Sequence, residues 1–216
     1  MIFINQDTNT VILSARKCGL MTLTHSITEH FKNKSFSFPY SLNKSLDPWM
    51  ENINLVDVMD YPEFDKNAWK DWNVILIIRE PYERYLSGLY TLHNIKWLGT
   101  RNNIRIFRKF GEEDIEFDKW FEQVLANTGT YHLNNGHCKP FLHKTVDMKY
   151  KSLKVINQNN LDNWLSNNKY SIKHLNITPT QNKQSIKQYI DDNHKENVLK
   201  MLEKEYEIFL DFEKDM

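Results

Sequence analysis

Two short segments of the chain carry basic and hydroxyl side chains at spacings that suit an anionic ligand. The first runs from Arg16 to Thr22 and contains Lys17 and one glycine, Gly19. It follows an apolar run and precedes a helical pattern, so it is expected at a helix N-terminus, which favours phosphate or sulfate. Its lysine precedes the glycine, unlike the lysine of a Walker loop. An ordinary basic turn is the alternative interpretation.

The second segment runs from Arg79 to Ser87 and follows the strongest strand pattern of the chain. A guanidinium can donate two parallel hydrogen bonds to a phosphate and a hydroxyl can add a third, so Arg79 and Ser87 could hold a second anion. Arg84 lies three residues before Ser87, on a neighbouring position of one face of the expected helix. Instead of facing a ligand, Arg84 could form an ion pair with Glu80, four residues before it. Two such sites indicate a ligand with two separated phosphate-like groups.

Short apolar runs alternate with helical patterns and predict an α/β fold with a mainly parallel sheet. Strands are expected at residues 11–13, 53–59, 72–78 and 153–156. Helices are expected after residue 20, after residue 81, at 117–125, from residue 161 and over 185–212, with irregular segments at 96–116 and 127–150. Ligands of such sheets bind beyond the carboxyl ends of the strands, where both basic segments are expected.

Composition narrows the class of protein. The chain has 216 residues and few glycines and prolines, which predicts a single domain over residues 1–216. Its 28 Lys+Arg balance 28 Asp+Glu, which argues against a general nucleic-acid-binding protein. No apolar stretch approaches the ~20 residues of a membrane helix, and residues 1–10 lack the pattern of a signal peptide, so a cytoplasmic protein is expected. Cys18 and Cys138 cannot build a disulfide framework.

The segment from Arg79 to Ser87 closely resembles the R-x-P-x-x-R-x-x-S motif of sulfotransferases. The sulfuryl donor of that family is 3′-phosphoadenosine 5′-phosphosulfate (PAPS). The resemblance implies that Arg79 and Ser87 bind the 3′-phosphate of PAPS. It also implies that Lys17 and Gly19 correspond to the family's 5′-phosphosulfate loop, P-K-x-G-[ST]-T.

The phosphosulfate loop departs from the family pattern in three places. Arg16 replaces the proline, and Leu20 and Met21 replace the two hydroxyl residues. Thr22, one position later, is the candidate substitute for the missing hydroxyl. We therefore take Arg16 and Thr22, with Lys17, Gly19, Arg79 and Ser87, as the candidate donor-binding residues.

Three downstream segments are similar to Golgi-type carbohydrate sulfotransferases. Residues 131–138 resemble the H-W-x-P-Q…C stretch, residues 155–161 a strand ending in E-x-L, and residues 205–209 the terminal D-F-x-x-F. The resemblance covers nearly the whole chain. It implies a P-loop-like three-layer domain, with a central sheet flanked by helices, and a carbohydrate hydroxyl as acceptor.

Sulfuryl transfer requires a cation that neutralises the leaving group and a base that accepts the acceptor's proton. Lys17 is the candidate cation. The resemblance places a histidine or carboxylate near the end of the strand before the arginine strand, which makes Asp57 the preferred base. The alternatives for the base are Asp60, Glu63, His25 and His132.

Other functions stay open at this point. A nucleotide kinase-like phosphotransferase would need a Walker lysine after a glycine, and the chain shows none. A non-catalytic nucleotide-binding module would explain Leu20 and Met21. A group of potential metal ligands lies within twelve residues, but its spacing matches no standard zinc pattern, so no metal is expected; the group is His132, His137, Cys138 and His143.

Overall fold

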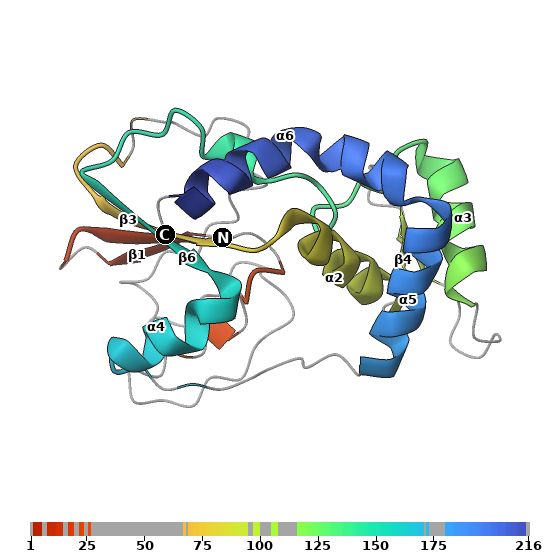
Figure 1. The fold of residues 1–216 in the computed structure, drawn as a ribbon, viewed down its shortest axis with the longest axis horizontal. Helices are drawn as coiled ribbons and strands as arrows, with labels where there is room; N and C mark the ends of the chain where they lie inside the picture. Colours follow the sequence, from red (N-terminus) through yellow and green to blue (C-terminus); the bar gives the residue numbers. More distant parts are fainter. Residues whose placement is uncertain are drawn as a thin grey trace. The chain divides into compact units, whose positions relative to one another are not determined.

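The computed structural model describes residues 2–5, 8–14, 17–19, 22–23, 26, 67, 69–94, 97–99, 105–107, 116–170, 172 and 180–214. Over these residues the fold is mixed α/β (Figure 1). The strands are β1 (Ile2–Asn5), β2 (Thr10–Ser14), β3 (Asn73–Ile78), β4 (Trp97–Gly99), β5 (Arg105–Phe107) and β6 (Ser152–Asn157). The α-helices are α2 (Pro81–Asn94), α3 (Phe117–Thr128), α4 (Leu161–Asn167), α5 (Thr180–Asn193) and α6 (Lys195–Lys214).

The chain divides into two compact units. The first, called the sheet unit here, comprises residues 1–79, 144–177 and 212–216. The second, called the helical unit, comprises residues 80–143 and 178–211. The single domain expected over residues 1–216 stays a prediction.

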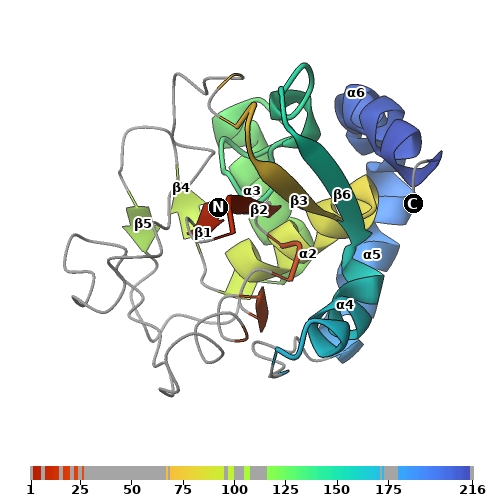
Figure 2. The same cartoon turned by 90° about the vertical axis from the view of Figure 1, so that its left-hand side faces the viewer.

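The sheet unit contains a four-stranded sheet in the order β1-β2-β3-β6 (Figure 2). Strands β2, β3 and β6 are parallel, with Leu76 of β3 opposite Leu13 on one side and Val155 on the other. Buried apolar side chains on both faces of β3 suit a central parallel strand. The predicted strands at 11–13, 72–78 and 153–156 are therefore confirmed. The strand expected at 53–59 lies outside the described residues.

Strand β1 was not predicted from the sequence, and it pairs with β2 in the antiparallel direction. At the other edge, β6 leads through the 3₁₀ turn η4 (Gln158–Asn160) into α4. The Asn157 side chain accepts a hydrogen bond from the backbone N–H of Asn159 at 3.1 Å, which shapes this turn. Leu161, Trp164 and Leu165 of α4 are buried.

The helical unit is built around α2, whose predicted start at Pro81 is confirmed. Proline suits the first helical turn, where a backbone N–H has no partner. The carboxylate of Glu80 caps this turn by accepting hydrogen bonds from the backbone N–H groups of Tyr82 at 3.2 Å and Glu83 at 2.6 Å. One core joins α2 to its neighbours α3, α5 and α6, with buried members such as Tyr85 and Phe121.

The helical pattern over residues 185–212 forms two helices instead of one, with a break at His194. The Nε2 atom of His194 lies 2.8 Å from the Oε1 atom of Glu122, and its ring packs beside Phe121. Apolar side chains keep helical spacing on both sides of the break, so periodicity alone does not reveal it. The segment expected to be irregular at 96–116 also contains the antiparallel pair β4 and β5.

Candidate functional site

The first basic segment forms a tight loop after β2. The buried Ser14 hydroxyl donates a hydrogen bond to the Cys18 carbonyl oxygen at 3.3 Å. Lys17 and Gly19 have φ angles of 70° and 72°. This left-handed conformation costs a non-glycine residue about 1–2 kcal/mol. A Cβ on Gly19 would lie 2.6 Å from the Cδ2 atom of Leu161, so glycine is needed both for its φ angle and for the close approach.

Arg79 links this loop to the end of β3. Its Nη1 atom donates a hydrogen bond to the Lys17 carbonyl oxygen at 3.2 Å. Because β2 and β3 are parallel neighbours, their carboxyl ends lie at the same edge of the sheet. The structure thus brings together Lys17 and Arg79, which come from the two basic segments identified in the sequence.

The backbone N–H of Leu23 donates to the Gly19 carbonyl oxygen at 2.9 Å, and the half-buried Thr22 has helical backbone geometry. Most of the helix expected after residue 20 lies outside the described residues. Ser87 is half-buried in α2 of the helical unit. The candidates that lie outside the described residues are Arg16, Asp57, Asp60, Glu63 and His25.

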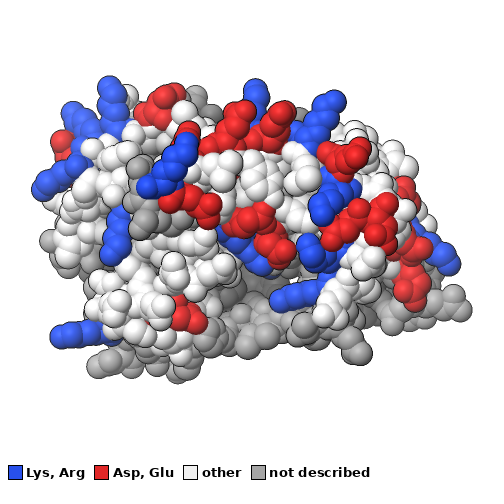
Figure 3. Space-filling view, in the orientation of Figure 1, with Lys and Arg blue, Asp and Glu red and all other residues white. Residues whose placement is uncertain are grey.

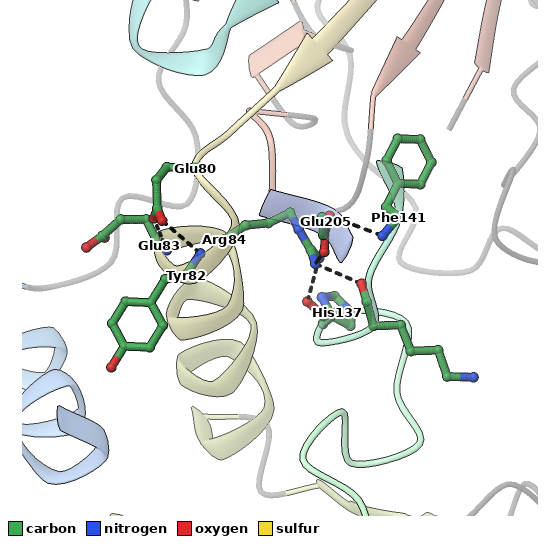
Figure 4. Close-up of polar contacts among 8 residues, drawn as sticks. Glu80, Tyr82, Glu83, Arg84, His137, Phe141 and Glu205 are labelled. Carbon is green, nitrogen blue, oxygen red and sulfur yellow. Dashed lines mark hydrogen bonds and ion pairs between the residues drawn. The ribbon is translucent and has the colours of Figure 1, made fainter. Parts of the chain in front are cut away.

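Arg84, the second arginine of the motif, is buried and bound to protein groups (Figure 4). Its Nη2 atom lies 2.9 Å from Glu205 Oε2 and donates to the Lys139 carbonyl oxygen at 2.8 Å. The other oxygen of Glu205 accepts a hydrogen bond from the backbone N–H of Phe141 at 3.1 Å. Arg84 therefore joins α2 to α6 and to the segment 137–141, and Glu80 is not its ion-pair partner.

Gly88 lets helix α2 approach the segment 137–141 closely, because it has no side chain. A Cβ at this position would lie 2.5 Å from the carbonyl oxygen of His137 and 3.1 Å from Cys138 Sγ. The Arg84 Nη1 atom also reaches the His137 carbonyl oxygen, at 3.5 Å. One face of α2 is thus fitted to residues 137–141.

The pairing of Glu205 with Arg84 of the motif was not predicted from the sequence. Glu205 lies on α6 between the buried residues Leu202 and Phe209, at spacings of three and four. A carboxylate at a core position of an amphipathic helix needs a cationic partner, because an unpaired buried charge is very costly. The core position of Glu205 in the amphipathic pattern of α6 was therefore the sequence feature that could have indicated a buried cationic partner.

Two tyrosines attach α2 to the C-terminal helices. The Tyr82 hydroxyl donates to Asp191 Oδ1 of α5 at 2.8 Å, and the Tyr206 hydroxyl of α6 donates to Glu80. Burial, and then the hydrogen bond to Asp191, raise the pKa of Tyr82. Burial opposes ionisation of Asp191 too, but its hydrogen bonds from Tyr82 and Lys195 lower its pKa. These contacts fix the start of α2.

The histidine-rich segment does not form a metal site among the residues that the structure describes. His132 Nδ1 accepts a hydrogen bond from the backbone N–H of Asn134 at 3.0 Å, and Cys138 is fully buried. Figure 3 shows basic and acidic side chains intermixed on the face that carries α6. Within the described part of the chain, no helix combines the length and apolar character needed to cross a membrane.

Comparisons of the chain with protein-family models, with characterised proteins and with solved structures find no match. What the site does must therefore be inferred from its own residues.

Proposed function

We propose that this chain is a PAPS-dependent sulfotransferase that transfers a sulfuryl group to an acceptor hydroxyl. The proposed acceptor is a carbohydrate, because the downstream segments resemble those of carbohydrate sulfotransferases. The observation that carries the proposal is the contact between Arg79 and the Lys17 loop at neighbouring ends of β2 and β3. The same edge of a parallel sheet is where α/β proteins bind phosphate-bearing ligands. The proposal includes a P-loop-like three-layer arrangement around the β2-β3-β6 sheet.

The loop conformation supports a role for Lys17 in binding the 5′-phosphosulfate. Left-handed φ angles at Lys17 and Gly19 turn the backbone sharply after β2. A helix N-terminus presents N–H groups to an anion, and in the proposal Arg16, Gly19 and Thr22 act with Lys17 at this end of the donor. Strained backbone positions of this kind are often found at functional sites.

The 3′-phosphate is assigned to Arg79 and Ser87. Arg79 is half-buried, and charge-assisted hydrogen bonds to a phosphate are stronger where water is partly excluded. The Ser87 hydroxyl makes no hydrogen bond to another described residue, whereas its carbonyl oxygen accepts one from Thr91. Arg84 is excluded from this assignment because protein groups already surround it.

In the proposed reaction the acceptor oxygen forms a bond to the donor sulfur as the bond from sulfur to the phosphate oxygen breaks. The electron pair of the broken bond stays on 3′-phosphoadenosine 5′-phosphate, and the ammonium of Lys17 neutralises the charge that develops there. The acceptor's proton passes to a base, for which Asp57 is the proposed residue. Holding the two oxygens in line supplies much of the acceleration.

The test compares ligands by thermal shift and then measures transfer. 3′-Phosphoadenosine 5′-phosphate is expected to raise the unfolding temperature more than ATP with magnesium does, because only the former carries a 3′-phosphate. Radiolabelled sulfate is then expected to pass from PAPS to members of a panel of mono- and oligosaccharides. Stronger stabilisation by ATP with magnesium would favour a kinase-like phosphotransferase. Binding without transfer to any acceptor would favour a non-catalytic module.

A further inference from the structure

A cavity of about 490 Å³ lies in the helical unit between α6 and the segment 132–143. Its walls include Lys139 and Pro140 from the segment and Lys200, Met201, Lys204 and Glu205 from α6. All of its lining residues belong to the helical unit, whereas Lys17 and Arg79 belong to the sheet unit. The volume is in the range of pockets that hold small organic ligands.

Three lysines line this cavity, and none of them forms an ion pair with another described residue: Lys139, Lys200 and Lys204. Lys200 and Lys204 are four residues apart, so they are neighbours on one face of α6, and like charges at this spacing destabilise a helix. Two other lysines of the helical unit do form ion pairs. The Nζ atom of Lys187 lies 3.7 Å from Glu83 Oε1, and the Nζ atom of Lys195 lies 3.2 Å from Asp191 Oδ1.

The acidic residues of the cavity do not cancel these charges. Glu205 lines it, but its carboxylate is neutralised by Arg84 and by the backbone N–H of Phe141. Glu203 is the remaining carboxylate of the lining, so the three lysines leave a net charge of about +2. A ligand with two negative charges matches this balance.

The wall that carries Lys139 is held in place before any ligand binds. Arg84 donates to the Lys139 carbonyl oxygen at 2.8 Å, and Glu205 accepts from Phe141 two residues later. Since Arg84 and Glu205 are both 2% exposed, these anchors are shielded from water. A site whose geometry is fixed in advance loses less entropy on binding.

We infer that this cavity binds a small organic phosphate monoester of about the size of a monosaccharide phosphate. A phosphate monoester carries close to two negative charges above its second pKa of about 6, which matches the three lysines and Glu203. Pro140, Met201 and the aliphatic stems of the lysines provide apolar surface for the organic part. This site is additional to the proposed donor site.

The experiment titrates the 216-residue chain at pH 8 by calorimetry with glucose 6-phosphate, glucose 6-sulfate, inorganic phosphate and glucose. Glucose 6-phosphate is expected to bind most tightly, because glucose 6-sulfate has one negative charge, inorganic phosphate has no organic part and glucose has no charge. Equal binding of inorganic phosphate, or equal binding of glucose, would overturn the inference.

Variants locate the binding. The double substitution Lys200→Met with Lys204→Met is expected to lower the affinity for glucose 6-phosphate by about tenfold or more, since two charge-assisted contacts are lost. Lys183→Met, which removes an exposed lysine of α5 outside the cavity, is the matched control and should change nothing. Unaltered affinity in the double variant would refute the site. Arg79→Ala should leave glucose 6-phosphate binding intact, and its loss there would assign the phosphate to the donor site instead.

Discussion

Arg84 and Glu205 form an ion pair with an Nη2 to Oε2 distance of 2.9 Å, and both side chains are 2% exposed. The two residues are 121 positions apart in the chain. Buried ion pairs contribute little net stability unless other hydrogen bonds support them, and here backbone groups of His137, Lys139 and Phe141 do so, although the Arg84 Nε atom has no partner among the described residues. The two arginines of the motif therefore differ in their contacts: Arg84 joins elements within the helical unit, whereas Arg79 contacts the Lys17 loop in the sheet unit.

Breaking this pair from one side should destabilise the chain strongly. Glu205→Gln leaves the Arg84 guanidinium buried without its counter-charge, which is expected to lower the free energy of unfolding by about 3–5 kcal/mol. Urea unfolding followed by tryptophan fluorescence measures the loss. The double variant Arg84→Met with Glu205→Met should recover most of it, because neither charge is then buried. Glu207→Gln, an exposed substitution on the same helix, is the control, and a loss as large there would contradict the assignment.

The close approach of α2 to residues 137–141 gives a second prediction. In Gly88→Ala the new methyl group would lie 2.5 Å from a backbone oxygen, which cannot move as a side chain can. We expect a loss of about 1–3 kcal/mol in the free energy of unfolding, typical of overpacking.

The variant Gly129→Ala is the control for Gly88→Ala. Gly129 ends α3 with a φ angle of 64° and has nothing near its Cβ position, so alanine should cost only the left-handed conformation, about 1 kcal/mol. Chemical denaturation of both variants separates steric overlap from backbone strain. A Gly88→Ala variant as stable as the wild type would show that α2 can shift away from His137.

The part of the fold that could be predicted from the sequence has strong local signals. Val74 to Ile78 form an uninterrupted apolar run, and Pro81 fixes where the next helix begins. Those two signals place Arg79 at the carboxyl end of a central strand. The loop at Lys17 followed from a shorter apolar run and a single glycine, and its contact with Arg79 depends on the parallel pairing of β2 and β3.

The parts that were missed depend on contacts between residues distant in sequence. The break between α5 and α6 is fixed by the packing of His194 against Phe121 and Glu122 of α3, which leaves the helical periodicity unchanged. β1 is only four residues long, and its direction follows from its antiparallel register with β2. Glu205 has the sequence environment of a core residue, but only tertiary structure shows that Arg84 is its partner.

Acid should weaken the contact between α2 and α5. Since the pKa of Asp191 is lower in the folded chain than its ordinary value of about 4, the ionised carboxylate stabilises the fold above that pH. This contribution is lost as the pH falls through the lowered pKa. At pH 7, Asp191→Asn is therefore expected to reduce the free energy of unfolding by about 1 kcal/mol, through the weakened hydrogen bond with Tyr82.

The pH dependence supplies the check. Thermal unfolding of Asp191→Asn and the wild type should differ at pH 7, and this difference should shrink as the pH falls through the lowered pKa of Asp191, where the wild-type carboxylate becomes protonated. Asp192→Asn, at the exposed neighbouring position, should have little effect at either pH. A gap between Asp191→Asn and the wild type that stays constant throughout acid titration would mean that ionisation of Asp191 does not contribute.

Lys17→Ala should impair turnover more than donor binding. The Arg79 hydrogen bond goes to the carbonyl oxygen of residue 17, so it survives removal of the side chain, and the loop keeps its anchor. What is lost is the ammonium that is proposed to neutralise the leaving phosphate. Sulfate transfer measured beside calorimetric binding of 3′-phosphoadenosine 5′-phosphate separates the two effects. Wild-type turnover in this variant would end the catalytic assignment of Lys17.

Arg79→Ala should do the opposite and weaken binding first. The guanidinium is expected to make charge-assisted hydrogen bonds to the 3′-phosphate, each worth about 1.5–3 kcal/mol, so the affinity for 3′-phosphoadenosine 5′-phosphate should fall by about tenfold or more. Adenosine 5′-phosphosulfate, which has no 3′-phosphate, should bind the variant and the wild type almost equally. Lys154→Ala removes an exposed positive charge from β6 and serves as the control. A folded Arg79→Ala variant that loses affinity for both nucleotides to the same extent would show that Arg79 acts by anchoring the Lys17 loop and not by contacting the 3′-phosphate.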